Sequence, residues 1–113
     1  MSKIGRDDFS KAVIDALSKR AGFMCSNPNC RKLTVGSNSN DSKATIIGEA
    51  AHITAAAVGG PRYNELLSSD ERSDIANGIW LCSSCATLID KDPDTYTLPL
   101  LYLWKGGLKL KQK

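Results

Sequence analysis

Apolar and polar residues recur along the N-terminal half of the chain in patterns that predict one helix and one strand. A run with the spacing of a helix face ends near Gly22, and its apolar members are Phe9, Ala12, Val13, Ala16 and Leu17. Residues 36–43 are polar and predict a loop. The segment 45–53, TIIGEAAHI, predicts a strand with His52 at its end.

The middle of the chain predicts a short helix followed by a second strand. Ser68 and Glu71 have the spacing of a capping box, which favours a helix over residues 69–75. Asn77-Gly78 is typical of a tight turn and leads into the apolar run that ends at Cys82. We therefore expect two strands that meet near this turn.

Two helices are predicted after the second strand. Residues 86–90 form the first, and the second begins near Pro99 with an apolar side made of Leu100, Leu101, Leu103 and Trp104. The last helix runs into Gly106-Gly107 and a basic tail without a stop signal. We expect an α+β fold in a single domain over residues 1–113, with its core at about 20–105, cut from a longer chain.

Composition places the chain among ordinary globular proteins. It has 113 residues, of which 42% are hydrophobic and 24% charged, so neither disorder nor a fibrous class is indicated. No apolar run approaches the roughly 18 residues of a membrane span, and the first residues lack the apolar core of a signal peptide. A cytoplasmic location without a membrane partner is expected. The net charge of +3 is compatible with nucleic acid but equally with a slightly basic soluble protein.

Four cysteines fall in two close pairs, Cys25-x4-Cys30 and Cys82-x2-Cys85. In a reducing compartment such pairs on turn residues favour tetrahedral binding of Zn²⁺ over two disulfides. Four buried free cysteines would leave the pairing unexplained, and a redox Cys-x-x-Cys would leave the first pair unexplained. Because four thiolates fill the coordination sphere, this zinc is expected to hold the fold and not to catalyse.

Three segments, 48–53, 59–63 and 77–90, resemble the HNH endonuclease family over about residues 20–105. They read GEAAHI, GGPRY and NGIWLC-x-x-C-x-x-LID. The resemblance implies a small ββα-metal (His-Me finger) domain with a four-cysteine zinc site and flanking helices, which hydrolyses phosphodiester bonds of double-stranded DNA. The run is most similar to the HNH domains of CBASS anti-phage effectors, so the full-length protein is expected to carry a cyclic-nucleotide-sensing SAVED domain and to form a homo-oligomer.

The resemblance also assigns roles to individual residues. His52 is the base that activates water, and Asn77 pins the loop between the strands, although a plain Asn-Gly turn is the alternative for Asn77. Asp90 binds a catalytic Mg²⁺ or Mn²⁺, but the histidine expected one helical turn earlier is Ala86. The residue before His52 is also a ligand in many relatives and is Ala51 here. Glu49 is the candidate substitute, although strand alternation places it on the opposite face of the strand from His52.

Three cations flank the expected site, namely Arg62, Arg72 and Lys91. They are predicted to contact DNA phosphates, with solvated surface charge as the alternative for each. Trp80 and Trp104 are expected in the core and not as platforms for stacked bases.

Three hypotheses about function follow. The first is a DNA endonuclease domain inactivated by Ala86, through an engineered substitution that silences a toxic nuclease. The second is a natural pseudonuclease, a catalytically dead module with a structural zinc site that only binds DNA. The third is a zinc-stapled protein-interaction module.

Overall fold

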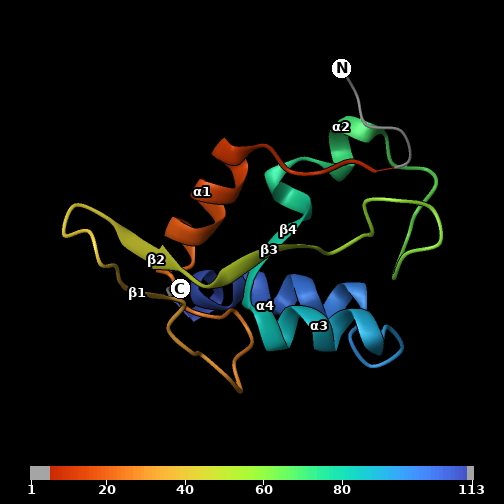
Figure 1. Cartoon of the computed structure of the whole chain (residues 1–113). Coiled ribbons are helices and arrows are strands. Elements are labelled where there is room, and N and C mark those ends of the chain that lie inside the picture. Colours follow the sequence, from red (N-terminus) through yellow and green to blue (C-terminus); the bar gives the residue numbers. More distant parts are fainter. Residues whose placement is uncertain (1–5, 112–113) are drawn as a thin grey trace.

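A pair of antiparallel strands lies at the centre of the computed structural model, which describes residues 6–111 and, for side chains, residues 6–106 (Figure 1). Strand β3 spans Gly48–His52 and strand β4 spans Gly78–Cys82. Their register pairs Gly48 with Cys82 and His52 with Gly78. The expected second strand is therefore confirmed, and the candidate base His52 lies at the end of β3 opposite the start of β4.

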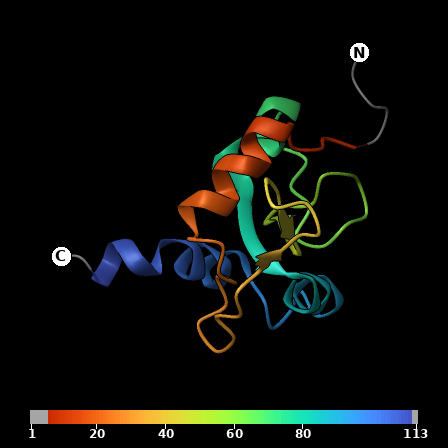
Figure 2. The same ribbon diagram turned by 60° about the vertical axis from the view of Figure 1, so that its left-hand side comes forward.

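Helices cover both faces of this strand pair. Helix α1 (Lys11–Arg20) packs on one face, while α3 (Ser83–Lys91) and α4 (Leu98–Lys111) lie on the other (Figures 1 and 2). Every residue of β4 is buried as a result. Gly78 faces α1 so closely that an added Cβ would lie 2.5 Å from a methyl carbon of Leu17, so the approach of α1 depends on this glycine.

The core lies between β4 and the two C-terminal helices. Ile79, Leu81, Ile89 and Leu101 are fully buried there and pack with three of the four cysteines. Trp80 points to the other side of β4, where its ring covers Gly48 and its indole N–H donates to Thr34 Oγ1 at 2.8 Å. The expectation that Trp80 is a core residue is confirmed.

The region predicted as one strand, residues 45–53, is two strands. β2 (Ala44–Ile46) is separated from β3 at Ile47, whose backbone N–H donates to the Thr34 carbonyl at 2.8 Å. β2 pairs with β1 (Val35–Ser37), so the predicted polar loop 36–43 was wrong at its first two residues. Local side-chain hydrogen bonds explain the hairpin, since Asn38 donates to Thr45 and accepts from the N–H of Asn40.

The segment before β4 contains two short helical elements. Helix α2 (Ser69–Arg72) begins with the predicted capping box, because the Ser68 hydroxyl and the Glu71 carboxylate each accept from the other's backbone N–H. It ends early, since Asp74 caps a 3₁₀ helix, η1 (Ile75–Asn77), by accepting from Ala76 N. The predicted tight turn at Asn77-Gly78 was therefore wrong.

The remaining helix predictions agree with the structure apart from their ends. Helix α1 starts after Ser10, whose hydroxyl accepts from Val13 N. In α4 Leu101 is buried and Trp104 packs against the core, but Leu103 is 53% exposed and does not belong to the apolar side. The helix continues past Gly106 to Lys111, and the last two residues of the basic tail lie outside the described range. Within residues 6–111, no helix is both long and apolar enough to cross a membrane.

Candidate metal centre and adjoining cavity

The four cysteines lie together although about 50 residues separate the two pairs. Their sulfur atoms are all within 4.8 Å of one another, and Cys30 Sγ lies 3.9 Å from Cys82 Sγ. A disulfide would need about 2.05 Å. Tetrahedral ligands at about 2.3 Å from a zinc ion would stand roughly 3.8 Å apart, so the cluster can hold a metal such as zinc.

Local backbone structure explains why the sulfurs converge. The first pair lies on a loop anchored to the sheet, where Ser26 N donates to the Trp80 carbonyl at 3.0 Å. The second pair lies where β4 meets α3, and Cys82 caps that helix by accepting from Cys85 N at 3.4 Å. Asn27 donates to Cys85 Sγ at 3.5 Å. Only the first pair is therefore on a turn, since the second occupies a helix start.

The protonation of the thiols depends on this packing. Burial raises the pKa of Cys85 to about 12 and also raises that of Cys25. Burial acts in the same direction on Cys82, but hydrogen bonds from Cys85 N and neighbouring thiols outweigh it and lower the pKa. A buried cluster of this kind needs a cation to become a set of thiolates, which is what a zinc ion supplies.

A cavity of about 480 Å³ adjoins the end of β3. It brings together His52, Ala86 and Asp90, three positions to which the sequence assigned roles. Small residues form most of the wall, while its charged side chains are Arg6, Glu49 and Asp90. The two elements that carry the candidate site residues, β3 and α3, therefore line one cavity.

His52 is held from the N-terminal segment, which the sequence did not connect with the site. Its Nε2 lies 2.8 Å from the Asp7 carbonyl oxygen, and its ring stacks on Phe9 with centroids 3.9 Å apart and planes 8° apart. Burial lowers the pKa of His52, and nearby Arg6 acts in the same direction, while the Asp7 carbonyl raises it. The net lowering keeps the imidazole neutral near pH 7, as a base requires.

Asn77 ties the chain after β3 to the chain before β4. Its amide donates to the carbonyls of Thr54 and Arg72, both at 2.9 Å, and its side-chain oxygen accepts from Thr54 N at 2.9 Å. The Asn77 carbonyl also accepts from Ile53 N. With 3% exposure Asn77 is not the residue of a plain surface turn.

Arg62 does not contact solvent as a phosphate ligand would, so its predicted role was wrong. Its side chain is 5% exposed and donates to the carbonyls of Ile53, Ile89 and Tyr96. Its remaining nitrogen pairs with Asp90 Oδ1 at 3.0 Å. Arg62 therefore joins the loop after β3 to α3 and orients the Asp90 carboxylate, which is 52% exposed.

Arg72 is likewise buried, and its predicted contact with phosphate was wrong. Its side chain is 10% exposed, lies over the Tyr63 ring at 4.7 Å and pairs with Asp7 at 3.4 Å. Lys91 remains exposed at the end of α3 beside Asp90. Arg6, which the sequence did not single out because it lies in no periodic element, has a 59% exposed side chain at the cavity.

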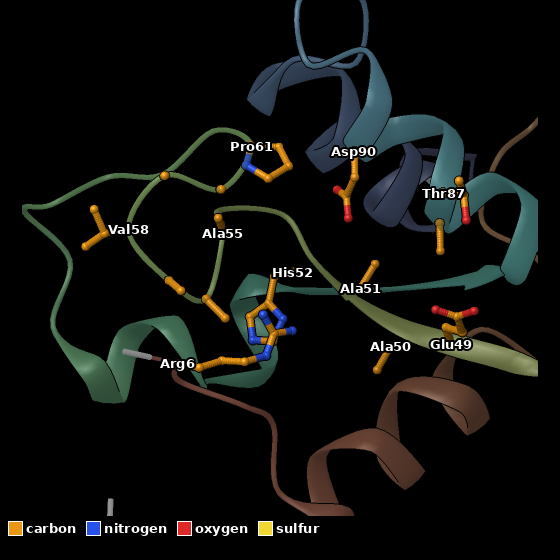
Figure 3. A pocket seen from close by; sticks show the side chains of 15 residues that line it. Arg6, Glu49, Ala50, Ala51, His52, Ala55, Val58, Pro61, Thr87 and Asp90 are labelled. Carbon is orange, nitrogen blue, oxygen red and sulfur yellow. The ribbon is translucent and has the colours of Figure 1, made fainter. Parts of the chain in front are cut away.

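The donors for a second, catalytic metal form an incomplete set. Figure 3 shows Glu49 and Ala51 on the side of β3 that faces α3, with Asp90 across from them, while His52 points the other way. Strand alternation thus places Glu49 as predicted, yet the same cavity reaches both sides of the strand end. Glu49 and Asp90 offer oxygen atoms, but within the described residues they join no third ligand to form a cluster.

Removing zinc is expected to unfold the domain. Zinc binding to four thiolates carries an apparent free energy of about 10–16 kcal/mol, which small domains use for folding. Elemental analysis should give one zinc per chain, and a strong chelator should abolish the thermal transition. Acid should release the metal, because each raised thiol pKa favours the protonated form as pH falls. A zinc-free chain that melts unchanged contradicts this prediction.

Replacing Arg62 should destabilise the domain more than an exposed arginine does. Arg62→Met leaves three carbonyls without their donor, which is expected to lower the free energy of unfolding by about 3 kcal/mol. Arg20→Met at the exposed end of α1 is the control, with a change below about 0.5 kcal/mol. Urea denaturation followed by tryptophan fluorescence measures both, and equal losses would refute the structural role of Arg62.

Comparisons with known proteins assign no family to this site. No family model matches the chain, and no curated protein matches its sequence.

Proposed function

We propose that the chain is an HNH-type, ββα-metal nuclease domain, stapled by a four-cysteine zinc site, whose cavity receives a DNA phosphodiester. One observation carries the proposal: His52 from β3 and positions 86 and 90 from α3 line the same cavity. The order of elements, two antiparallel strands followed by a helix, supports it as well. Anti-phage defence in the manner of CBASS effectors remains the biological setting that the sequence resemblance favours.

In this proposal His52 takes a proton from the attacking water. The Asp7 carbonyl can only accept a hydrogen bond, so Nε2 of the neutral ring carries the proton and Nδ1 keeps the lone pair that a base needs. Asn77 holds the two residues that follow His52 and thereby limits movement of the strand end. A base placed in this way typically contributes roughly 10²–10⁴-fold to the rate.

The Mg²⁺ or Mn²⁺ that such nucleases use would neutralise charge on the phosphate and the leaving oxygen. Asp90 and Glu49 are the oxygen donors on the cavity wall, whereas Ala86 and Ala51 have no ligand atom. One oxygen of Asp90 is already engaged by Arg62. We therefore derive no catalytic step through this ion for the present chain and treat position 86 as the missing ligand.

A catalytically dead DNA-binding module is the second candidate function, and the incomplete donor set favours it over an active enzyme. Both candidates share the same contacts with DNA. Arg6 at the cavity and Lys91 on α3 are exposed and take the place of the buried Arg62 and Arg72 as proposed phosphate contacts, although Arg6 Nε also pairs with Asp8 at 2.6 Å.

Binding to duplex DNA should be weak, tolerant of sequence and steeply dependent on salt, because the contacts are with phosphate. Arg6→Ala and Lys91→Ala should each lower affinity and reduce the slope of log Kd against log salt by about one. Lys43→Ala, in the exposed β1–β2 loop, is the matched control. Fluorescence anisotropy with a labelled duplex measures all four proteins. An affinity insensitive to salt would contradict the phosphate contacts, and absence of binding at low salt would favour a protein-interaction module.

Introducing histidine at position 86 should restore DNA cleavage with Mg²⁺ or Mn²⁺. Ala86→His places an imidazole one helical turn before Asp90 on the cavity wall. The metal ion stabilises the transition state by several kcal/mol, and loss of one of its ligands weakens its binding. The present chain should therefore cut at least about 10³-fold more slowly. Nicking of supercoiled plasmid, measured at equal zinc content, gives the rates.

His52→Ala in the Ala86→His background serves as the control. Cleavage should disappear, while the protein remains folded with the zinc content of the parent. A folded, zinc-loaded Ala86→His protein that leaves plasmid intact with both metals would leave the DNA-binding module as the function. Efficient cleavage by the unchanged chain would show that Ala86 is not a missing ligand.

A further inference from the structure

The N-terminal segment, residues 6–9, lies across His52 without being part of any helix or strand. Phe9 stacks on the imidazole, and the Asp7 carbonyl accepts from its Nε2. The backbone N–H of Asp7 in turn donates to the Ala56 carbonyl at 2.9 Å. The segment therefore touches both the candidate base and the loop that forms the cavity wall.

These contacts restrict the imidazole in two independent ways. A stacked ring with planes 8° apart fixes the plane in which the imidazole lies. The carbonyl acceptor fixes which nitrogen carries the proton, since an Nδ1–H tautomer would set a lone pair against the lone pair of the carbonyl. Orientation and tautomer of His52 thus depend on where the backbone of Asp7 lies.

A segment without regular secondary structure needs something else to hold it. The Asp7 carboxylate pairs with Arg72 at 3.4 Å, and the two side chains are only 19% and 10% exposed. Arg72 is itself fixed, because it donates to the Asn64 carbonyl at 3.1 Å and lies over the Tyr63 ring. Its own carbonyl accepts from Asn77.

We infer that Asp7, fastened by the buried guanidinium of Arg72, is a positioning residue that keeps His52 in the tautomer with its lone pair on Nδ1. The inference rests on the proposed role of His52 as a base. An exposed ion pair stabilises a structure by only about 0–1 kcal/mol, which is too little to hold the backbone of Asp7 in place. The largely buried pair is different, because loss of the carboxylate leaves a cation without its partner in the interior. Arg72 already has one buried nitrogen, Nε, with no hydrogen-bond partner.

The test uses the fact that His52 is the only histidine in the chain. Its ring signals in a two-bond ¹H–¹⁵N correlation spectrum are therefore assigned without ambiguity, and no DNA or catalytic metal is needed. The zinc-loaded parent should show one neutral tautomer, protonated at Nε2, with ring protons shifted upfield by Phe9. Asp7→Asn should show a mixture of both tautomers and lose most of the upfield shift.

Matched variants separate positioning from a general loss of stability. Asp15→Asn makes the same chemical change in the exposed Asp15–Lys19 pair of α1 and should leave the His52 spectrum as in the parent. Arg72→Lys keeps the charge but loses the planar guanidinium that donates to Asp7 and Asn64 together. It should therefore also give a mixture of His52 tautomers and a smaller upfield shift. If Asp7→Asn does not fold, Arg72→Lys decides the question.

The outcomes distinguish this inference from the proposed function. A folded Asp7→Asn or Arg72→Lys protein with the parent's single tautomer and ring shifts overturns the positioning role. In the Ala86→His background, Asp7→Asn should lower kcat by about tenfold or more with KM nearly unchanged. If Ala86→His is itself inert, the proposed function fails, while the spectra still decide what holds His52.

Discussion

The antiparallel pairing of β3 with β4 is the constraint on which the rest of the site depends. Because His52 lies opposite Gly78 in this register, Asn77 comes directly beside the residues that follow His52 and hydrogen-bonds to them. At the other end of the pair, Gly48 opposite Cys82 sets where α3 begins. A slip of one residue would turn His52 to the face of α3 and break the Asn77 contacts.

Polar and ionic links supplement a small hydrophobic core. A chain of 113 residues buries a modest share of its surface, and the core cluster contains only five fully buried aliphatic side chains among the described residues. The cysteine cluster joins the loop at Cys25 to the start of α3, while Arg62 joins the loop after β3 to the far end of the same helix. These links hold segments of irregular backbone that apolar packing alone does not fix.

Local patterns in the sequence predicted most helices, the second strand and the paired cysteines, because each depends on spacing within a few residues. The resemblance added His52, Asn77 and Asp90, of which His52 and Asp90 line one cavity while Asn77 hydrogen-bonds to the chain that follows His52. The burial of the Arg62 and Arg72 side chains was not predictable from local patterns. An arginine donates to buried carbonyls where the tertiary fold leaves those carbonyls without other donors. The residues next to it in the sequence do not show where this happens. The role of segment 6–9 was not predictable for the same reason. Phe9 was assigned to the apolar side of the first helix, which begins only at Lys11, and the contacts of the segment are with His52, more than 40 residues further along the chain.

The end of a strand is a favourable place for the proposed chemistry. Alternation sends His52 to one side of β3 and Glu49 to the other, where Asp90 approaches from α3, and beyond the last strand residue the cavity reaches both sides. In-line displacement at phosphorus sets the attacking water and the leaving oxygen on opposite sides of the phosphate. A base on one side and oxygen ligands on the other match that requirement without any large movement. The alanine and glycine residues of the wall leave the volume that a phosphodiester needs, so rigidity must come from elsewhere. Asn77, Arg62 and the Asp7–Arg72 pair supply it from outside the cavity.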